Sequence, residues 1–423
     1  MPALPVSAPA SPIRWRTLSA VIAGVVALAA VTSRASSIDS TTRDVRALWV
    51  TRATLTSAAA VAKMVAAAKA GGFNTLLVQV RGRGDAYYRS TLEPRPAELA
   101  AHPGFDPLGT TIAQARDAGL RVHAWVAVNL VSSATTLPSS REHVVYKHPE
   151  WLMVPKALAV ELRGIDTRSP AYLGRLARWS RQNSEDVEGL YLSPLHTAAA
   201  GHIAGVIREL VSEYPLDGVH LDYVRYPSED FDYSRAALRE FKQSVQPDLT
   251  AAEGQTLRAR ESLDPFAYPN FFPERWKAFR RSRLTSLVMR VKTAVKEARP
   301  EAIVSAAVIP DAAEAYQSRL QDWRTWLDQS LIDVLCPMAY TPDPKQFEAQ
   351  VALAQDYAGG RPVWTGIGAY RLSAAATLQF IAASKRLGAS GVALFSYDAL
   401  IAPPYSSSTL TDIGRAAFGA GTY

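Results

Sequence analysis

The sequence is almost free of cysteine. Its single cysteine, Cys336, cannot form a disulfide within the chain, and zinc-finger spacings are absent. Cys336 lies in the apolar run Ile332–Pro337. Because free cysteine is among the most often buried residue types, we expect Cys336 to fill the core as a small hydrophobic side chain rather than to act as a nucleophile.

Motifs of several enzyme classes are also missing. No glycine-rich dinucleotide fingerprint is present, since Gly82-Arg83-Gly84 lacks the third glycine. There is no Gly-x-Ser-x-Gly elbow, which disfavours a serine hydrolase. The His-x-His pair of metal-dependent barrel hydrolases is absent from the first predicted strand. The sequence therefore predicts no cofactor and no metal.

The chain has no lysine-rich run either. Its 46 Lys and Arg residues outnumber 39 Asp and Glu residues, giving a net charge of +7, but the positive residues are scattered. We therefore expect no nucleic-acid partner. A basic surface of this kind suits association with an anionic cell-wall polymer or with a membrane surface.

The first 40 residues differ from the rest of the chain. Arg14 and Arg16 precede an apolar run over residues 18–31, which is too short to span a bilayer. Small residues follow, with Ser33-Arg34-Ala35 as a candidate cleavage site. This order is typical of a signal peptide, and an uncleaved amino-terminal anchor is the alternative. The sequence thus predicts an exported protein: secreted, periplasmic or held in the cell envelope.

Residues 44–420 read as one domain. Hydrophobic residues make up 48% of the chain and charged residues 20%, which is typical of a folded globular protein. Short β-like runs alternate with helical runs, and this pattern predicts an α/β fold with a parallel sheet. A single (β/α)8 barrel of the TIM type is favoured over a doubly wound open sheet. The predicted strands are 46–52, 73–81, 120–129, 216–227, 302–310, 332–340, 362–370 and 390–397.

Two segments exceed the usual loop length. They cover residues 131–188 and 228–272, and each follows the carboxyl end of a predicted strand. A barrel builds its site at that face, so we interpret both segments as walls of a long groove. Variable decoration of the barrel is the alternative interpretation.

The stretch Leu216–Pro227 has the strongest functional signal. Its alternation of apolar and polar residues places His220 and Asp222 on one face of a strand. A carboxylate at a buried strand end is costly to desolvate unless it is paired or hydrogen-bonded. Asp222 is therefore either a catalytic group or a residue that merely caps the next turn or pairs with Arg225. His123 and His220 could join Asp222 on a metal, although the same spacing suits a hydrogen-bonded pair.

Carboxylates, aromatic rings and arginines collect at the other strand ends as well. Sugar rings stack on aromatic faces, and glycosidic cleavage needs two carboxyl groups. We therefore predict a polysaccharide site in which Asp222 is nucleophile or general base and Asp85, Asp311 or Asp398 supplies the second carboxyl group. The predicted substrate-binding residues are Gln79, Arg81, His123, Trp125, Asn129, His220, Tyr223, Arg225, Tyr340, Trp364 and Tyr397.

Several motifs occur together in an order that resembles a known family. They are Arg46-Ala-Leu-Trp-Val, Asn74 to Arg81, Gly84-Asp85-Ala-Tyr-Tyr, His148-Pro-Glu-Trp151, Leu192-Ser-Pro194, Asp217 to Pro227 and Gly391 to Asp398. The chain is similar over residues 45–398 to the glycosyl-hydrolase-like family ten, whose members include a hydrolase of peptidoglycan glycan strands.

The resemblance implies a (β/α)8 fold and a glycoside hydrolase, with Asp222 as the foremost catalytic candidate and an acidic residue at the position of Asp85. Peptidoglycan glycan strands are then the expected substrate. Two features depart from the family: Ser193 stands where Asn is common, and the segment after Pro227 lacks the usual tyrosine-rich pattern. A non-catalytic glycan-binding barrel at the cell wall is the alternative, and it would lack a second carboxyl group within reach of Asp222.

Overall fold

The computed structural model describes residues 42–419. By internal contacts the chain divides into two units, Met1–Arg43 and Asp44–Tyr423. The predicted signal peptide lies outside the described residues. Among the residues that the structure describes, no helix has the length and apolar character needed to cross a membrane.

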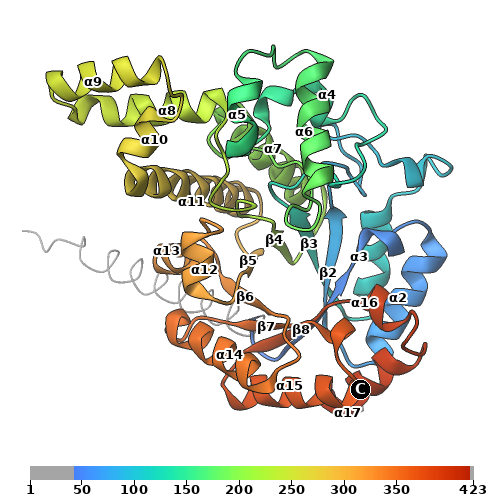
Figure 1. The fold of residues 1–423 in the computed structure, drawn as a ribbon. Helices are drawn as coiled ribbons and strands as arrows, with labels where there is room; N and C mark the ends of the chain where they lie inside the picture. Colours follow the sequence, from blue (N-terminus) through green and yellow to red (C-terminus); the bar gives the residue numbers. More distant parts are fainter. Residues whose placement is uncertain (1–41, 420–423) are drawn as a thin grey trace, which may run out of the picture. The chain divides into compact units, whose positions relative to one another are not determined.

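Eight parallel strands form a closed barrel in the second unit (Figure 1). Each strand pairs with the next along the chain, and β8 closes the barrel on β1 through register pairs such as Ala47 with Ala393. The predicted (β/α)8 fold is confirmed. The strands are β1 (Val45–Val50), β2 (Thr75–Arg81), β3 (Arg121–Ala127), β4 (Gly218–Asp222), β5 (Ile303–Val308), β6 (Val334–Ala339), β7 (Trp364–Ile367) and β8 (Gly391–Leu394).

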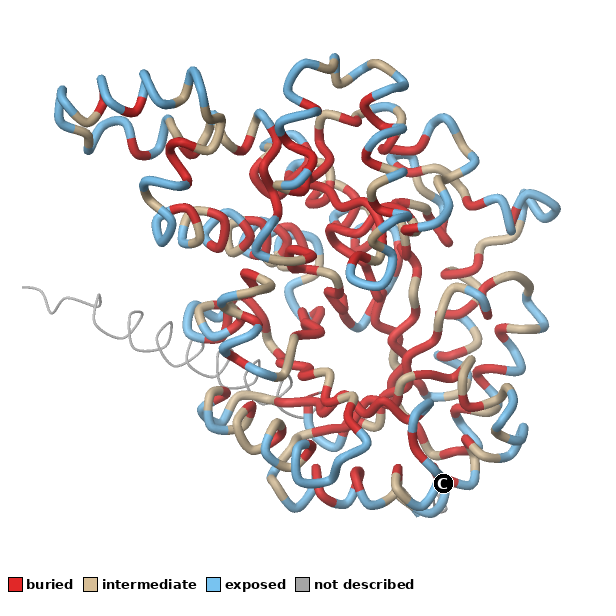
Figure 2. The backbone as a smooth tube through the Cα atoms, in the orientation of Figure 1, coloured by how far each residue is buried: buried red, intermediate tan, exposed pale blue. Residues whose placement is uncertain are grey.

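The two faces of each strand serve two separate cores. Outward side chains such as Leu48 and Val219 pack in the large core beneath the helices. Inward side chains such as Trp49, Trp125 and Cys336 fill the barrel itself. This is the period-two alternation of a strand, with both faces buried because helices cover the outside. Cys336 is fully buried, as predicted, and Figure 2 shows the strands buried along the barrel.

The helices that follow the strands start and stop at recognisable residues. The α2 helix begins after Ser57, whose side chain accepts the N–H of Ala60, and it buries Val61, Met64 and Val65. The helices around the barrel are α2 (Ala58–Ala70), α3 (Pro107–Asp117), α7 (Thr197–Glu213), α11 (Pro273–Ala298), α12 (Ala312–Gln317), α13 (Trp323–Asp328), α14 (Pro344–Ala358), α15 (Ala374–Arg386), α16 (Tyr397–Leu400) and α17 (Thr409–Phe418). Short 3-10 turns are η1 (Arg52–Thr54), η2 (Ala97–Leu99) and η5 (Ala369–Arg371).

Both long predicted segments contain helices of their own. The first holds α4 (Val144–Lys147), η3 (Pro149–Trp151), α5 (Lys156–Leu162) and α6 (Pro170–Gln182), and the second holds α8 (Arg235–Val245), η4 (Gln246–Asp248), α9 (Ala251–Glu261) and α10 (Ala267–Phe271). In Figure 1, α5 and α6 lie beside the loops at the carboxyl ends of β3 and β4, whereas α8 and α9 project away from the barrel. Only the first segment and the start of the second are thus placed to line a groove.

Positive φ angles set two element boundaries. The predicted strand 216–227 ends at Asp222, because Tyr223 has a positive φ of 49° and leaves the sheet. The helical stretch after β5 is broken at Leu320, which has a φ of 52°, so that α12 ends before it and α13 begins after it. Left-handed backbone at a non-glycine residue is uncommon and leaves no clear signal in a hydrophobic pattern.

Candidate active site at the mouth of the barrel

Asp222 is the last residue of β4 and lies at the carboxyl end of the barrel, 7% exposed. A carboxylate this buried needs hydrogen-bond donors, and it has three. The indole N–H of Trp125 donates to Oδ2 at 3.1 Å. Oδ1 accepts from the backbone N–H of Tyr223 at 2.6 Å and from Arg225 at 3.2 Å. The contact with Arg225, considered from the sequence as the alternative to a catalytic role, is present, and Asp222 nevertheless lines an open cavity.

The backbone conformation of Tyr223 directs its N–H group at this carboxylate. Its φ of 49° lies in the left-handed region, which costs a non-glycine residue on the order of 1–3 kcal/mol. The guanidinium of Arg225 lies over the Tyr223 ring, 4.2 Å from its centroid. Burial, followed by the charge of Asp222, raises the pKa of Tyr223 to about 12. Tyr223 is therefore a neutral hydroxyl at physiological pH.

A cavity of about 220 Å³ opens beside Asp222. Its walls come from the ends of seven strands or from the residues just after them, and they combine flat aromatic rings with hydrogen-bonding groups. The lining residues are Trp49, Thr51, Gln79, Trp125, Asp222, Tyr223, Arg225, Ala307, Met338, Tyr340 and Phe395. Six of them are predicted from the sequence as site residues and the others are not, although Trp49 and Phe395 lie within the family-like motifs.

The aromatic rings of this cavity pack edge to face. Tyr340 lies against Trp49, with ring centroids 6.2 Å apart and planes at 88°, and against Tyr370 at 6.3 Å and 89°. Phe395 contacts Trp49 and Trp125 in the same manner. Such pairs fix the orientation of the rings. Burial, then the neighbouring Cys336 and Asp222, raises the pKa of Tyr340 well above its ordinary value, so its hydroxyl stays protonated.

His220 lies beneath this cavity and is fully buried. Its Nε2 accepts the indole N–H of Trp49 at 3.2 Å, and its Nδ1 lies 2.9 Å from the hydroxyl of Ser305. Burial lowers the pKa of His220 to about 3, so the ring is neutral. With Nε2 accepting, Nδ1 carries the proton and donates to Ser305. His220 therefore supports the Trp49 wall and does not itself line the cavity.

Glu188 is a carboxylate that the sequence analysis missed. Its Oε1 lies 3.7 Å from the same Arg225 that binds Asp222, and its Oε2 accepts the hydroxyl of Tyr191 at 2.6 Å. One guanidinium thus separates the two carboxylates. Burial by itself lowers the pKa of Arg225. Asp222 and the other acidic neighbours have the larger effect, so the pKa of Arg225 is raised. The only sequence signal was the position of Glu188 at the end of the long segment 131–188.

Asp85 lies in an adjoining cavity of about 330 Å³. Its carboxylate is 3.5 Å from the guanidinium of Arg52 and accepts the backbone N–H of Arg83 at 2.9 Å. Thr51 and Arg52 are consecutive residues, one in each cavity, so the two cavities are neighbours. Gly82 makes room for this arrangement, because a Cβ there would lie 2.3 Å from the Arg52 guanidinium. The structure thus places Asp85 near the mouth of the barrel but not in the Asp222 cavity.

Two other predicted carboxylates lie outside the Asp222 cavity and are hydrogen-bonded elsewhere. Asp398 accepts the backbone N–H of Thr51 at 2.8 Å and the hydroxyl of Thr54 at 2.5 Å, which ties the end of β8 to the end of β1. Asp311 is exposed and caps α12, where it accepts the N–H groups of Ala313 and Glu314. Capping residues commonly follow barrel strands, and sequence alone does not separate them from catalytic carboxylates.

Arg81 is not available to substrate. It is fully buried, and its guanidinium binds both carboxylate oxygens of Glu93, at 2.6 and 2.7 Å. It also donates to the backbone carbonyl of Val128 at 3.2 Å. The reason is a register shift between Gln79 and Arg81 on β2, which leaves Gln79 lining the cavity and directs Arg81 away from it.

Four further predicted binding residues are also buried away from the cavity. His123 and Trp364 pack against each other, with ring centroids 5.5 Å apart, and burial lowers the pKa of His123 to about 3. His123 lies two residues before the cavity-lining Trp125 on β3, and Trp364 begins β7, a strand with no residue among the described lining of the cavity. Asn129 is fully buried, and Tyr397 starts α16 within the outer core. Within residues 42–419, no group of three His, Cys, Asp or Glu side chains is arranged to hold a metal.

Comparisons with known proteins agree on the fold. A 25% identical relative is the glycosyl hydrolase DigH of Escherichia coli, matched over 289 residues, which is 64% of this chain and 55% of the relative. The glycosyl hydrolase YngK of Bacillus subtilis is 25% identical over 290 residues, covering 64% of this chain and 46% of the relative. The chain therefore spans about half the length of these curated relatives.

Solved structures show the same architecture. The PgaB (BpsB) glycoside hydrolase domain of Bordetella bronchiseptica superposes with a TM-score of 0.59 at 15% identity, covering 88% of this chain and 98% of that one. An α-L-fucosidase of Paenibacillus thiaminolyticus gives a TM-score of 0.57 at 17% identity, covering 88% of this chain and 49% of that one. The family model described as glycosyl hydrolase-like 10 matches residues 44–367. The chain belongs to the glycosyl hydrolase-like 10 family.

Proposed function

We propose that this protein is an exported glycoside hydrolase that cleaves glycosidic bonds of a polysaccharide, with Asp222 acting on the reacting sugar. The observation that supports this most is the setting of Asp222: a buried, triply hydrogen-bonded carboxylate in an aromatic cavity at the carboxyl end of a (β/α)8 barrel. Active sites of such barrels lie at this face. The matched relatives are named glycosyl hydrolases.

Glycosidic cleavage needs a second carboxyl group, and Glu188 is our candidate. Donors approach Asp222 from three sides, which suits an ionised carboxylate, because that form accepts hydrogen bonds and donates none. Asp222 would then be the nucleophile of a retaining mechanism or the general base of an inverting one. The inserted Arg225 keeps Glu188 from approaching Asp222 directly. Carboxyl pairs of retaining enzymes lie about 5–5.5 Å apart and those of inverting enzymes about 6.5–9.5 Å, so we propose inversion.

The tyrosines and tryptophans of the cavity would hold the sugar. Tyr340 and Tyr223 are protonated and can donate hydrogen bonds to sugar hydroxyls, while the faces of Trp49 and Trp125 border the same space. Most of this wall is braced by edge-to-face contacts, so the cavity is formed before substrate binds.

The substrate class and the location are part of the proposal. A signal-peptide pattern in residues 1–40 and a net charge of +7 suit an envelope protein that meets an anionic wall polymer. Peptidoglycan glycan strands are the first substrate to test. Binding to anionic wall material that weakens as salt rises supports this part of the proposal, and salt-insensitive binding counts against it.

The direct test is hydrolysis of purified wall glycan strands, with and without stem peptides, measured as the release of reducing ends. The full chain should release reducing ends, and Asp222→Asn should abolish their release while the protein melts as a folded domain. Asp311→Asn removes an exposed carboxylate that caps α12 and is the matched control. Unchanged turnover in Asp222→Asn would remove Asp222 from the mechanism.

A non-catalytic glycan-binding barrel is the second candidate. One observation favours it: Asp222 is the one carboxylate among the described residues that line its cavity. This candidate predicts that the wild-type chain binds glycan strands without releasing reducing ends, and that Asp222→Asn changes only the affinity. Binding and cleavage measured on the same strands separate the two candidates.

A further inference from the structure

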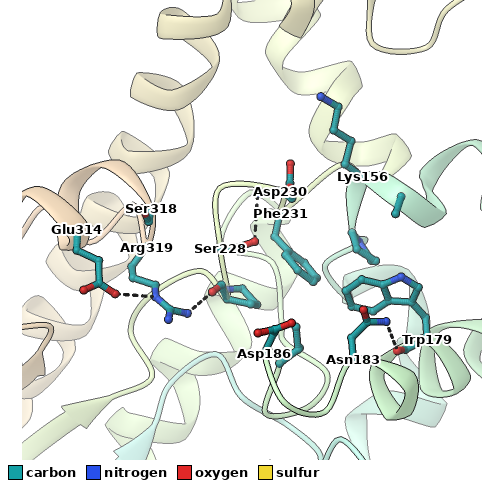
Figure 3. A pocket seen from close by; sticks show the side chains of 14 residues that line it. Lys156, Trp179, Asn183, Asp186, Ser228, Asp230, Phe231, Glu314, Ser318 and Arg319 are labelled. Atoms are coloured by element: carbon teal, nitrogen blue, oxygen red, sulfur yellow. Dashed lines mark hydrogen bonds and ion pairs between the residues drawn. The ribbon is translucent and has the colours of Figure 1, made fainter. Parts of the chain in front are cut away.

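A larger cavity lies beside the Asp222 site rather than within it. It has a volume of about 630 Å³, within the usual range of ligand sites. Three parts of the chain enclose it: the insertion that holds α5 and α6, the loop after β4, and α12 with the following residues Ser318 and Arg319. Figure 3 shows these parts converging on one space.

Trp179 and Phe231 form an aromatic wall of this cavity. The two rings meet edge to face with centroids 5.7 Å apart, and Trp179 is only half-buried. In Figure 3 Asn183 lies beside the indole, and in this view Asp186 lies between the indole and Arg319. The amide of Asn183 donates to the Trp179 carbonyl at 2.8 Å. A partly exposed indole bordered by amide, carboxylate and guanidinium groups is the kind of surface on which a pyranose ring stacks while its hydroxyl groups are hydrogen-bonded.

Buried polar groups hold these walls in place. Asp232 is fully buried and accepts the backbone N–H of Val154 at 2.8 Å, which joins the loop after β4 to the segment that leads into α5. The guanidinium of Arg280 on α11 donates to the carbonyl groups of Glu229 and Phe231. Burial raises the pKa of Asp232 and lowers the pKa of Arg280, so holding both groups here has a desolvation cost. The cavity is therefore preformed.

The same walls continue into the Asp222 site. Val187 lines the large cavity, and the next residue is Glu188, which contacts Arg225. Pro227 lines the large cavity and follows Asp222 by five residues, so their Cα atoms are at most about 18 Å apart. A few linked sugar units cover that distance. The main-chain N–H of Tyr226 and the side chain of Arg319 fix this connection, because Tyr226 donates to the Arg319 carbonyl and Arg319 donates to that of Pro227.

We infer that this cavity is a distal sugar subsite, in which Trp179 stacks on a pyranose unit of the polysaccharide several units away from the cleaved bond. The inference rests on the proposed function. It adds that the substrate is a strand long enough to occupy both sites. A glycan strand that occupies both sites is cleaved away from its ends, so long strands are better substrates than short oligosaccharides. Short chains cannot reach Trp179 from the Asp222 cavity.

The test compares Trp179→Ala with wild type on two probes, a long-strand fraction of purified wall glycan and a disaccharide from the same material. We expect the ratio of kcat/KM on long strands to kcat/KM on the disaccharide to fall about three- to tenfold, which corresponds to the loss of one aromatic stacking contact. Trp179→Phe keeps a flat ring and should recover most of the ratio. Phe271→Ala removes a partly exposed ring on the projecting α10 and should leave the ratio unchanged.

Binding to an inactive protein separates the inference from the proposed function. Asp222→Asn and Asp222→Asn/Trp179→Ala are titrated with the long-strand fraction, after thermal melts have shown that both are folded. Weaker binding of the double variant supports the subsite even if the wild type cleaves nothing, in which case only the proposed function fails. Equal binding of the two, or an equal loss of kcat/KM on both probes in Trp179→Ala, overturns the subsite.

Discussion

Trp125 and Asp222 are 97 residues apart in the chain, yet the indole N–H of Trp125 donates a 3.1 Å hydrogen bond to the Asp222 carboxylate. They lie near the ends of neighbouring strands β3 and β4. The bond acts on the carboxylate oxygen that neither Tyr223 nor Arg225 contacts. Trp125 therefore orients the carboxylate as well as bordering the cavity.

The first prediction follows from this bond. Trp125→Phe keeps an aromatic ring but removes the N–H, so Asp222 loses one of its three donors. A hydrogen bond to a charged group contributes about 1.5–3 kcal/mol, so we expect kcat to fall by about ten- to a hundredfold with a smaller change in KM. Trp323→Phe is the matched control, because the buried indole N–H of Trp323 has no hydrogen-bond partner among the described residues. Steady-state kinetics on glycan strands measure both variants, and equal effects of the two would contradict the role of this bond.

The second prediction concerns the second carboxyl group. Glu188→Gln keeps the shape of the side chain and its contact with Tyr191 but removes its acid or base function. Because general acid–base groups contribute about 10²- to 10⁴-fold, we expect a kcat loss of at least a hundredfold. Asp85→Asn should lower activity less, since Asp85 binds Arg52 outside the Asp222 cavity. A large loss in Asp85→Asn with a small loss in Glu188→Gln would reverse the assignment.

The anomeric form of the first product tests the same geometry independently. If Glu188 and Asp222 act as a pair separated by Arg225, the product should have the inverted configuration. Proton NMR during the first minutes of the reaction, before mutarotation, distinguishes the two anomers. Retention would point to a second carboxyl group closer to Asp222 than Glu188.

Structural features that follow from the alternation of side chains along a strand could be predicted from the sequence. The spacing of His220 and Asp222 placed both on one face of a strand, and the structure shows both directed into the barrel. The alternation of strand and helix likewise gave the barrel. In contrast, the role of Arg81 depends on a register shift that changes its direction, and hydrophobic patterns do not report such shifts.

Residues that enter the site through the closing of the barrel were harder to find. Phe395 follows β8 and meets Trp49 of β1 only because the two strands pair. Glu188 reaches Arg225 from an insertion whose path is not periodic. His123 and Trp364 show the opposite error: they are inward-facing residues on barrel strands, but they lie deeper than the cavity. Depth along a strand relative to its neighbours depends on barrel stagger, which sequence alone did not provide.

The third prediction is acid sensitivity of the fold. Burial lowers the pKa of His220 and of His123 to about 3, whereas an unfolded histidine titrates near 6.5. Between these values the unfolded chain binds more protons, so stability is complete above pH about 6.5 and falls as pH drops towards 3. Each histidine contributes a slope of up to about 1.4 kcal/mol of unfolding free energy per pH unit.

Urea unfolding measured from pH 4 to pH 7 checks this slope. His220→Gln keeps an acceptor for the Trp49 indole and removes the titrating group, so its unfolding free energy should fall less steeply with acid, whatever its value at pH 7. His102→Gln removes an exposed histidine and is the control. Parallel pH profiles for wild type and His220→Gln would rule out this role of His220.

The fourth prediction separates structural from substrate-binding arginines. Arg81 and Glu93 form a fully buried, doubly hydrogen-bonded ion pair, and the charge of Arg81 overcomes burial to lower the pKa of Glu93 to about 2. Among the residues that the structure describes, Arg81→Gln leaves the buried Glu93 carboxylate with His202 as its side-chain partner. Loss of one member of such a pair costs about 3–5 kcal/mol, so we expect a large drop in unfolding free energy.

Because Arg81 is sealed from the cavity, KM of the folded fraction should not change. Arg361→Gln, at a half-exposed arginine before β7, should change neither quantity. A raised KM with normal stability in Arg81→Gln would instead return Arg81 to the substrate site.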